Sequence, residues 1–208
     1  MDPRPGLGPD ELRRLEAEHN HGWRIRLMQP RDHRAHGVCG HEGHIAVQDQ
    51  HIAGEARQRA LGLFGEFDQD AGIRDIEATI HHIRRTLGVA KVGCVGYCLG
   101  GRLAYMTAAR TDIDASVGYY GVGIDGLLHE KHAIAHPLML HIPTEDGFVP
   151  RETQAAMHAG LGDHPKVTLH DYDGLDHGFA TETGQRRNEA AATLADSRTA
   201  AFFAEHLG

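Results

Sequence analysis

The sequence predicts an α/β fold in which helices cover both faces of a mostly parallel sheet. Two observations support this prediction. Short apolar runs typical of strands occur at residues 91–95, 115–121 and 137–142, and residues 166–172 alternate like a strand. Helical patterns lie between these runs, and a chain that alternates strands with helices forms a parallel sheet covered by helices.

The first helix of this alternation has the clearest pattern, over residues 71–87. Its apolar residues recur at steps of three and four and form one stripe that we expect to be buried, namely Ile73, Ile76, Ile80, Ile83 and Leu87. Asp70 is expected to cap the N-terminus of this helix, and Gly88 is expected to end it.

The other elements are predicted from shorter patterns. We expect helices over residues 55–67, 151–161 (with Pro150 at the first helical position) and 188–207, and a loop or short helix over 124–135. The last helix offers apolar residues for packing, namely Leu194, Ala201, Phe202 and Leu207. Upstream of residue 55 only residues 23–28 alternate like a strand, so N-terminal strands of the sheet are expected to be missing or altered.

A sharp turn flanked by glycines joins the strand at 91–95 to the helix that follows it. Its pattern is Gly-x-Cys-x-Gly, with Cys98 between Gly96 and Gly100. A nucleophile elbow of this kind lifts the central side chain above the sheet, where the N-terminus of the next helix favours negative charge. We predict Cys98 as a nucleophile and the N–H of Leu99 as an oxyanion donor. The alternative is a buried packing role for Cys98.

An acid and a histidine follow two later strands. Asp146 lies in a polar turn after 137–142, and His177 lies in a loop after 166–172. The chain order of nucleophile, acid and base is that of the α/β-hydrolase triad. Glu145 is an alternative acid, and an ordinary surface role is the alternative for Asp146 and His177. Two other histidines fall inside strands and are expected in the core or on a sheet face, namely His141 and His170.

These three residues together indicate nucleophilic catalysis. A free cysteine thiol has a pKa near 8.5 and needs a base at neutral pH, and His177 oriented by Asp146 is suited to take the proton. Attack on an ester or lactone carbonyl would form an oxyanion, and one backbone donor such as Leu99 N–H is worth about 3 kcal/mol there. Collapse to a thioester and attack by water would complete the cycle.

The chain resembles the dienelactone hydrolase (carboxymethylenebutenolidase) family of the α/β hydrolases from about residue 55 to its C-terminus. The resemblance rests on four motifs in order: the elbow Gly-Tyr-Cys-Leu-Gly-Gly at 96–101, Tyr-Tyr-Gly-Val-Gly at 119–123, Asp-x-Phe-Val-Pro at 146–150 and His-x-Phe-Ala at 177–180. It implies a carboxylic ester hydrolase that cleaves a small ester or lactone through Cys98, His177 and Asp146, without a cofactor or metal.

The resemblance also implies residues that bind substrate. Arg57, with Arg59 as an alternative, matches an arginine that contacts a substrate carboxylate, and Tyr97 in the elbow is assigned to substrate binding. A second such arginine is expected at position 181, where this chain has Thr181, so dienelactone itself is in question as the substrate. Glu42 is the candidate for a glutamate that activates the thiol.

Residues 1–54 form an atypical histidine-rich segment, which we separate from an α/β-hydrolase domain over 55–208. Many of the chain's 18 histidines lie there with few apolar neighbours. Three interpretations are open: a solvated, partly disordered arm, a sequence that is not native to the family, or a metal site. Pairs such as His33-x-x-His36 and Cys39-x-His41 motivate the metal site.

The composition limits the kinds of partner that we expect this protein to bind. Against 29 acidic residues the chain has 21 Lys and Arg, a net charge of −8, which gives no indication of binding to nucleic acid or an anionic membrane. No apolar run approaches the roughly 18 residues of a membrane span, and the N-terminus lacks the apolar core of a signal peptide. Three cysteines suit a reducing compartment. We expect a cytoplasmic protein, a monomer or weak homodimer, that acts on a small molecule.

A second function class is compatible with the same sequence. Without the upstream strands, the domain could be catalytically silent and bind a small carboxylate or a protein partner. Turnover of an ester separates this alternative from the hydrolase.

Overall fold

The computed structural model describes residues 25–28, 62, 65–182 and 185–208. In this part of the chain, strands form one sheet in the order β1-β2-β3-β4-β5. The strands are β1 (Ile25–Met28), β2 (Gly93–Tyr97), β3 (Ala115–Tyr119), β4 (Leu138–Pro143) and β5 (Val167–Tyr172). β1 runs antiparallel to β2, and the other neighbouring pairs are parallel. The predicted mostly parallel α/β fold is therefore confirmed.

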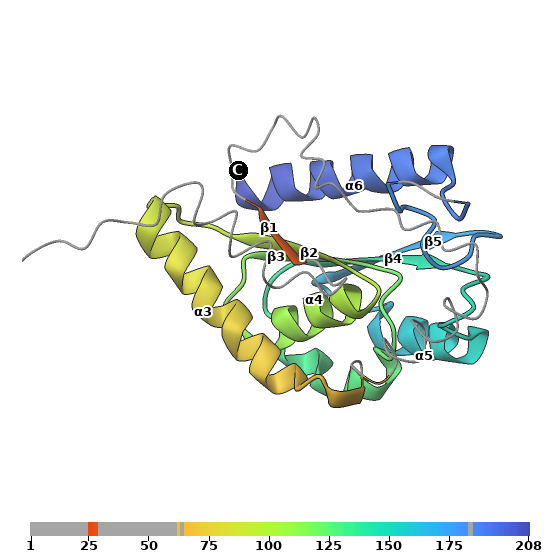
Figure 1. Ribbon diagram of the computed structural model, residues 1–208, viewed down its shortest axis with the longest axis horizontal. Helices are drawn as coiled ribbons and strands as arrows, with labels where there is room; N and C mark the ends of the chain where they lie inside the picture. Colours follow the sequence, from red (N-terminus) through yellow and green to blue (C-terminus); the bar gives the residue numbers. More distant parts are fainter. Residues whose placement is uncertain (1–24, 29–61, 63–64, 183–184) are drawn as a thin grey trace, which may run out of the picture.

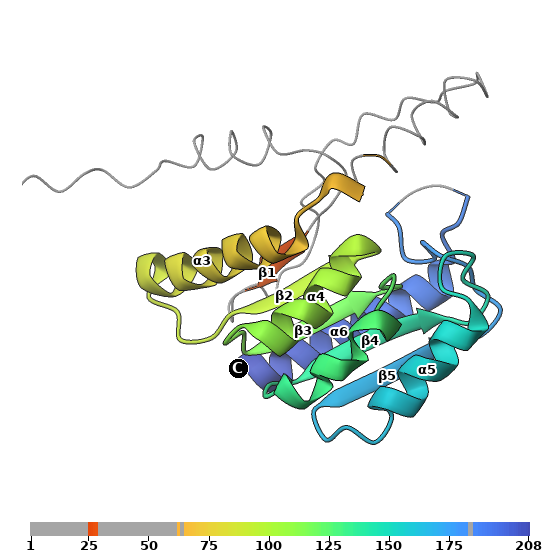
Figure 2. The ribbon, with the colours of Figure 1, turned by 90° about the horizontal axis from the view of Figure 1, so that it is seen from below.

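Helices cover both faces of this sheet (Figures 1 and 2). One face carries α3 (Gln69–Leu87), α4 (Leu99–Arg110), the 3₁₀ helix η1 (Asp125–Ala133) and α5 (Arg151–Leu161), and the other carries α6 (Glu189–Leu207). From β2 to β5 each strand lies beside the one before it, so right-handed crossovers keep α4, η1 and α5 on the same face. Among the described helices, only α6 lies across the opposite face.

Strands β2, β3 and β4 are buried on both faces, which explains why they are continuous apolar runs, whereas β5 alternates and is partly exposed. In β4, Leu138 and Leu140 pack in the cluster that holds the core side chains of α4 and α5. Met139 between them packs in the opposite cluster with Phe202 and Phe203 of α6. In the described part of the chain, no helix has both the length and the apolar character that a membrane span requires.

Helix α3 differs from its prediction at its N-terminus and in how far its buried stripe extends. It begins two residues early, because the carboxylate of Asp68 accepts the N–H of Ala71 at 2.9 Å and caps the helix in place of Asp70. Gly88 ends the helix at φ 64°, as predicted. Burial along the stripe stops before the last residue, since Ile80 is 0% exposed and Leu87 is 53% exposed.

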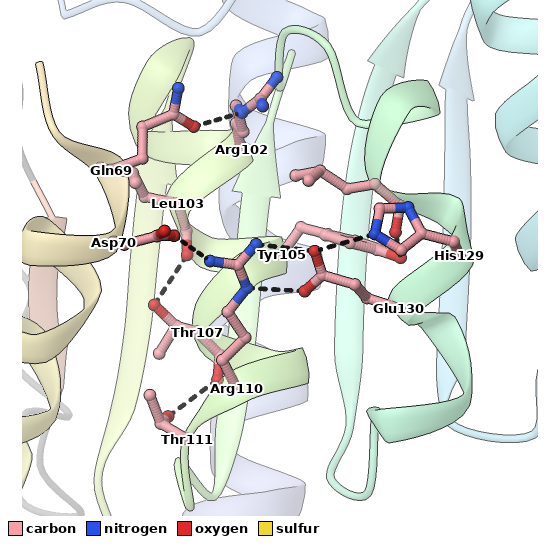
Figure 3. A network of polar contacts seen from close by, with 11 residues as sticks. Gln69, Asp70, Arg102, Leu103, Tyr105, Thr107, Arg110, Thr111, His129 and Glu130 are labelled. Atoms are coloured by element: carbon pink, nitrogen blue, oxygen red, sulfur yellow. Dashed lines mark hydrogen bonds and ion pairs between the residues drawn. The ribbon is translucent and has the colours of Figure 1, made fainter.

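Asp70 instead belongs to an ionic network that joins three helices (Figure 3). Arg110 of α4 donates to Asp70 at 2.6 Å and, with two nitrogens, to Glu130 of η1 at 2.6 and 2.7 Å. Nearby, Arg102 donates to the side chain of Gln69 at 2.7 Å and to the carbonyl of Gly123 at 2.8 Å. These bonds tie the start of α3 and the loop after β3 to α4.

Smaller differences concern the ends of other elements. The strand expected at 91–95 forms two residues later as β2, and Pro150 is the cap of α5 rather than its first residue. Asn188 is the cap of α6, and Leu194, expected to pack, is 48% exposed. The strand expected over 23–28 is present as β1. The helix expected over 55–67 lies mainly outside the described residues.

Burial along α3 yields a test of the fold. Ile80→Ala should lower the free energy of unfolding by about 3 kcal/mol, because it removes fully buried methyl groups and leaves a cavity. Leu87→Ala, in the same predicted stripe but exposed, should change it by about 0.5 kcal/mol or less. Urea unfolding followed by circular dichroism measures both variants, and equal losses would contradict the observed packing.

Candidate active site

The turn between β2 and α4 has the strained backbone of a nucleophile elbow. Cys98 has φ 58° and ψ −116°, a conformation that residues with a side chain rarely adopt. Its N–H donates to the carbonyl of Tyr119 in β3 at 3.0 Å, and its carbonyl accepts the N–H of Arg102 in α4 at 3.2 Å. Bonds to both neighbouring elements thus hold the strained residue in place.

Glycines allow α4 to lie directly on the strands at this turn. A Cβ added at Gly96 would lie 2.0 Å from the carbonyl oxygen of Gly100. One added at Gly101 would lie 2.6 Å from the carbonyl oxygen of Tyr119. Both contacts are with backbone, which cannot move aside as a flexible side chain would, so no larger residue fits at these positions.

This close approach predicts a sharp difference between two glycine substitutions. Gly96→Ala should destabilise the protein by about 3 kcal/mol or prevent folding, because the new methyl group collides with the backbone of α4. Gly126→Ala in η1 is the control, because open space surrounds that position, and it should stay within about 0.5 kcal/mol of the parent. Urea unfolding compares the two, and similar stabilities would rule out the observed elbow.

The acid and the base predicted from the sequence are in contact. Nδ1–H of His177 donates to the carboxylate of Asp146 at 2.9 Å to Oδ2 and 3.1 Å to Oδ1. Asp146 also accepts the N–H groups of Phe148 at 2.8 Å and Val149 at 3.2 Å, so this buried carboxylate is well solvated by protein donors. The alternative acid, Glu145, is exposed and pairs with Arg151.

A second aspartate holds the backbone of the same loops. Asp176 Oδ1 accepts the N–H of Gly147 at 2.9 Å and the N–H of His177 at 2.7 Å. These two bonds, led by that from Gly147, lower the pKa of Asp176. Asp176 thereby ties the loop after β5 to the loop after β4. Sequence reasoning noted only its position beside His177, and its role as a link depends on how the two loops fold together.

The pKa of His177 is raised to about 9. Burial of the ring opposes this rise, but the hydrogen bonds to Asp146 and to Cys98 outweigh burial because both favour the protonated ring. Since Nδ1 faces Asp146, Nε2 is the nitrogen available to the thiol. The three predicted residues therefore lie together at the carboxyl edge of the sheet, after β2, β4 and β5.

The raised pKa of His177 predicts a dependence of stability on pH. The ordinary histidine pKa is about 6.5, so the protonated ring stabilises the fold fully below pH 6.5, and this contribution is lost as the pH rises through about 9. Its upper limit is about 3 kcal/mol. Urea unfolding at pH 6 and pH 9.5 should show a larger loss for the parent than for His177→Gln. Equal losses in the two proteins would contradict the assignment.

Aromatic rings enclose the imidazole of His177. The rings of Phe148 and Tyr120 lie with centroids 4.7 Å and 4.8 Å from it. Tyr120 is 5% exposed and has φ 40°, the second positive φ among the described residues other than glycine. Sequence reasoning used both residues only as parts of motifs. Their contact with His177 is a further role that the loop geometry reveals.

The two histidines that fall inside strands, His141 and His170, contact other side chains of the sheet and of α6. His141 is 1% exposed and lies between Tyr172, 2.7 Å from Nδ1, and Thr199 of α6, 3.0 Å from Nε2. Burial lowers its pKa to about 3, so the ring is neutral. His170 stacks on it with ring centroids 5.7 Å apart. His141 thus joins β4, β5 and α6, in agreement with the core role predicted for it.

Of the remaining predicted residues, the structure describes Leu99 and Tyr97 but not Arg57 and Glu42. Leu99 is buried as the first residue of α4, and its N–H has no acceptor within the helix. The half-buried ring of Tyr97 lies 4.7 Å from that of Tyr119. Arg57 and Glu42 lie outside the described residues, as do the paired His and Cys residues at 33–44. Among the residues that the structure describes, His, Cys, Asp and Glu form no group of three or more suited to a metal ion.

Fold and site together define an α/β hydrolase. The strained elbow, the acid and the histidine follow parallel strands in the order and at the sheet edge typical of that fold. An esterase of Pyrococcus furiosus has the same fold, with a TM-score of 0.54, 18% identity and coverage of 65% of this chain and 62% of its own. A cold-adapted esterase from an Arctic intertidal metagenomic library also has this fold, with a TM-score of 0.55, 18% identity and coverage of 67% of this chain and 60% of its own.

Sequence comparison places the chain within this class. The model of the Dienelactone hydrolase family matches residues 41–207, so the chain belongs to that family. An Azospirillum brasilense protein provisionally named as a carboxymethylenebutenolidase is 44% identical over 155 residues, covering 74% of this chain and 67% of its own. Carboxymethylenebutenolidases of Pseudomonas putida and Cupriavidus pinatubonensis are each 38% identical, covering 71% and 69% of this chain. The chain spans only 63% and 61% of their lengths.

Proposed function

We propose that this chain is a hydrolase that cleaves a small ester or lactone through a thioester on Cys98. The observation that carries the proposal is the hydrogen bond of His177 to the buried Asp146 at the edge of the sheet where the strained turn presents Cys98. Family membership and the carboxymethylenebutenolidase relatives support the ester or lactone as the substrate class.

The reaction begins with transfer of the thiol proton of Cys98 to His177, whose raised pKa favours an imidazolium beside a thiolate. The thiolate sulfur attacks the carbonyl carbon, and the carbonyl π electrons move to oxygen. The N-terminus of α4, with the N–H of Leu99, stabilises this oxyanion. Asp146 keeps the ring in the required tautomer and orientation throughout.

The second half of the cycle restores the thiol. The oxyanion collapses to a thioester while His177 gives its proton to the departing alkoxide. The neutral ring then takes a proton from a water molecule that attacks the thioester carbon. Collapse of this second tetrahedral species releases a carboxylic acid, and the sulfur recovers its proton from His177.

Other parts of the proposal concern residues beyond this centre. We propose substrate contacts for Tyr97 and Arg57, the division of the chain at residues 54 and 55, and a cytoplasmic location. These follow from the sequence and from the family resemblance.

The central test is hydrolysis of an activated aryl ester. Cys98→Ala and His177→Ala should each lower turnover by a factor of about 10³ or more, because nucleophile and base act as a unit. Release of 4-nitrophenol from 4-nitrophenyl acetate measures the rate, and circular dichroism verifies that each variant is folded. Turnover retained in either folded variant would refute the mechanism.

The same assay distinguishes the second function class. Equal background rates in the parent and in Cys98→Ala would indicate a catalytically silent domain. A panel of lactones and acyl thioesters run on an active parent then separates a lactone hydrolase from a thioesterase.

A further inference from the structure

A path of side-chain hydrogen bonds crosses the sheet on the face that α6 covers. It joins β3, β4 and β5 to this helix through residues that the proposed mechanism does not use. In order, the members of this hydrogen-bond path are Arg198, Tyr172, His141, Thr199, Tyr119 and Asp196, with successive distances of 3.2, 2.7, 3.0, 2.7 and 3.1 Å. Its middle is buried, since Tyr119 is 0% and His141 is 1% exposed, whereas Asp196 lies at the surface.

The carboxylate at one end sets the direction of the first bonds. Asp196 can only accept, so the single hydroxyl proton of Tyr119 is donated to it. Thr199 must then donate its own hydroxyl proton to the oxygen of Tyr119. Since Thr199 has no second proton to give, it accepts from His141, and the proton of that ring lies on Nε2.

The state of the histidine ring sets the direction of the other bonds. Burial lowers the pKa of His141 to about 3, so the ring is neutral and carries one proton. With this proton on Nε2, Nδ1 accepts the hydroxyl proton of Tyr172. The oxygen of Tyr172 in turn accepts from Arg198, which can only donate. One proton order therefore satisfies all these bonds, and it runs from a cation to an anion that both belong to α6.

Tyr119 connects this hydrogen-bond path to the nucleophile. Its carbonyl accepts the N–H of Cys98 at 3.0 Å, and its ring lies 4.7 Å from the ring of Tyr97, the residue before Cys98. The φ of Cys98 is unfavourable, so the position of this residue depends on the partners that hold it. Because Thr199 and Asp196 hold the hydroxyl of Tyr119, that ring is oriented from the face of the sheet opposite α4.

Other members of the hydrogen-bond path support the loops of the acid and the base. The carbonyl of His141 accepts the N–H of Tyr120 at 2.8 Å, and the ring of Tyr120 lies 4.8 Å from that of His177. The carbonyl of Tyr172 accepts the N–H of Thr144, in the loop that carries the acid, at 3.0 Å. The path thus supports the backbone around all three catalytic groups.

We propose, building on the proposed hydrolase function, that Thr199 is a positioning residue that keeps the thiol of Cys98 in place through Tyr119. Its hydroxyl joins the two halves of the hydrogen-bond path, since it accepts from one side and donates to the other. An apolar side chain of the same shape can do neither. Without the hydroxyl, the buried groups on both sides lose a partner, and Tyr119 can shift together with the strained turn.

Removal of this one hydroxyl tests the role. Thr199→Val keeps the shape of the side chain and should lower kcat/KM for 4-nitrophenyl acetate about tenfold, because a small displacement of the nucleophile weakens the transition state. Thr199→Ser keeps the hydroxyl and should retain most of the activity. Thr107→Val is the matched control, because it removes a buried hydroxyl that bonds only within α4, and it should stay within about twofold of the parent. Equal losses in the two valine variants, or a serine variant as slow as the valine variant, would overturn the proposal.

Alkylation of the thiol separates this proposal from the hydrolase mechanism, because it needs no ester turnover. Iodoacetamide at pH 7, followed by mass spectrometry of the peptide that contains Cys98, should label Thr199→Val about fivefold more slowly than the parent, since activation by His177 requires the thiol in place. A merely loosened fold would expose the thiol and speed its labelling. Slower labelling without turnover by the parent would sustain the positioning role and refute the proposed function. Labelling at the parent rate or faster would overturn the role of Thr199 even in an active enzyme.

The proton order has a spectroscopic signature of its own. Nitrogen-15 NMR at pH 7 should show the neutral ring of His141 with its proton on Nε2, and the loss of its signals in His141→Gln identifies them. A proton on Nδ1, or a charged ring, would contradict the order of donors and with it the function of the Thr199 hydroxyl.

Discussion

The close approach of α4 to strands β2 and β3 is the constraint on which the site depends. Because Gly96 and Gly101 have no side chains, the backbone of α4 lies in close contact with the backbone of the strands, and α4 begins directly after Cys98. The positive φ of Cys98 is unfavourable on its own. It persists because the buried side chains of α4, such as Leu103 and Met106, pack α4 onto the sheet and fix both ends of the turn.

The histidine is held by two aspartates that act on different parts of it. Asp146 orients the imidazole through its side chain, and Asp176 holds the backbone N–H of the same residue. Asp146 accepts hydrogen bonds from backbone N–H groups of its own loop, and Asp176 accepts one from the N–H of Gly147 in the same loop. The position of His177 relative to Cys98 therefore depends on two loops that are joined by hydrogen bonds, as well as on the parallel strands beneath them.

The sequence predicted what depends on local periodicity and chain order. Strand and helix patterns predicted the fold, and the positions of Cys98, Asp146 and His177 just after strands β2, β4 and β5 predicted that they share one edge of the sheet. Choices that depend on distant partners could not be predicted. Asp68 rather than Asp70 caps α3, since Asp70 is engaged by Arg110 in another helix.

The acid and the histidine of this site are paired in the protein interior, and this burial has a physical consequence. Asp146 and His177 are buried, 6% and 7% exposed, where a low dielectric strengthens their interaction and each needs the other to offset the cost of burial. In the proposed enzyme, the buried pair therefore governs the chemical step.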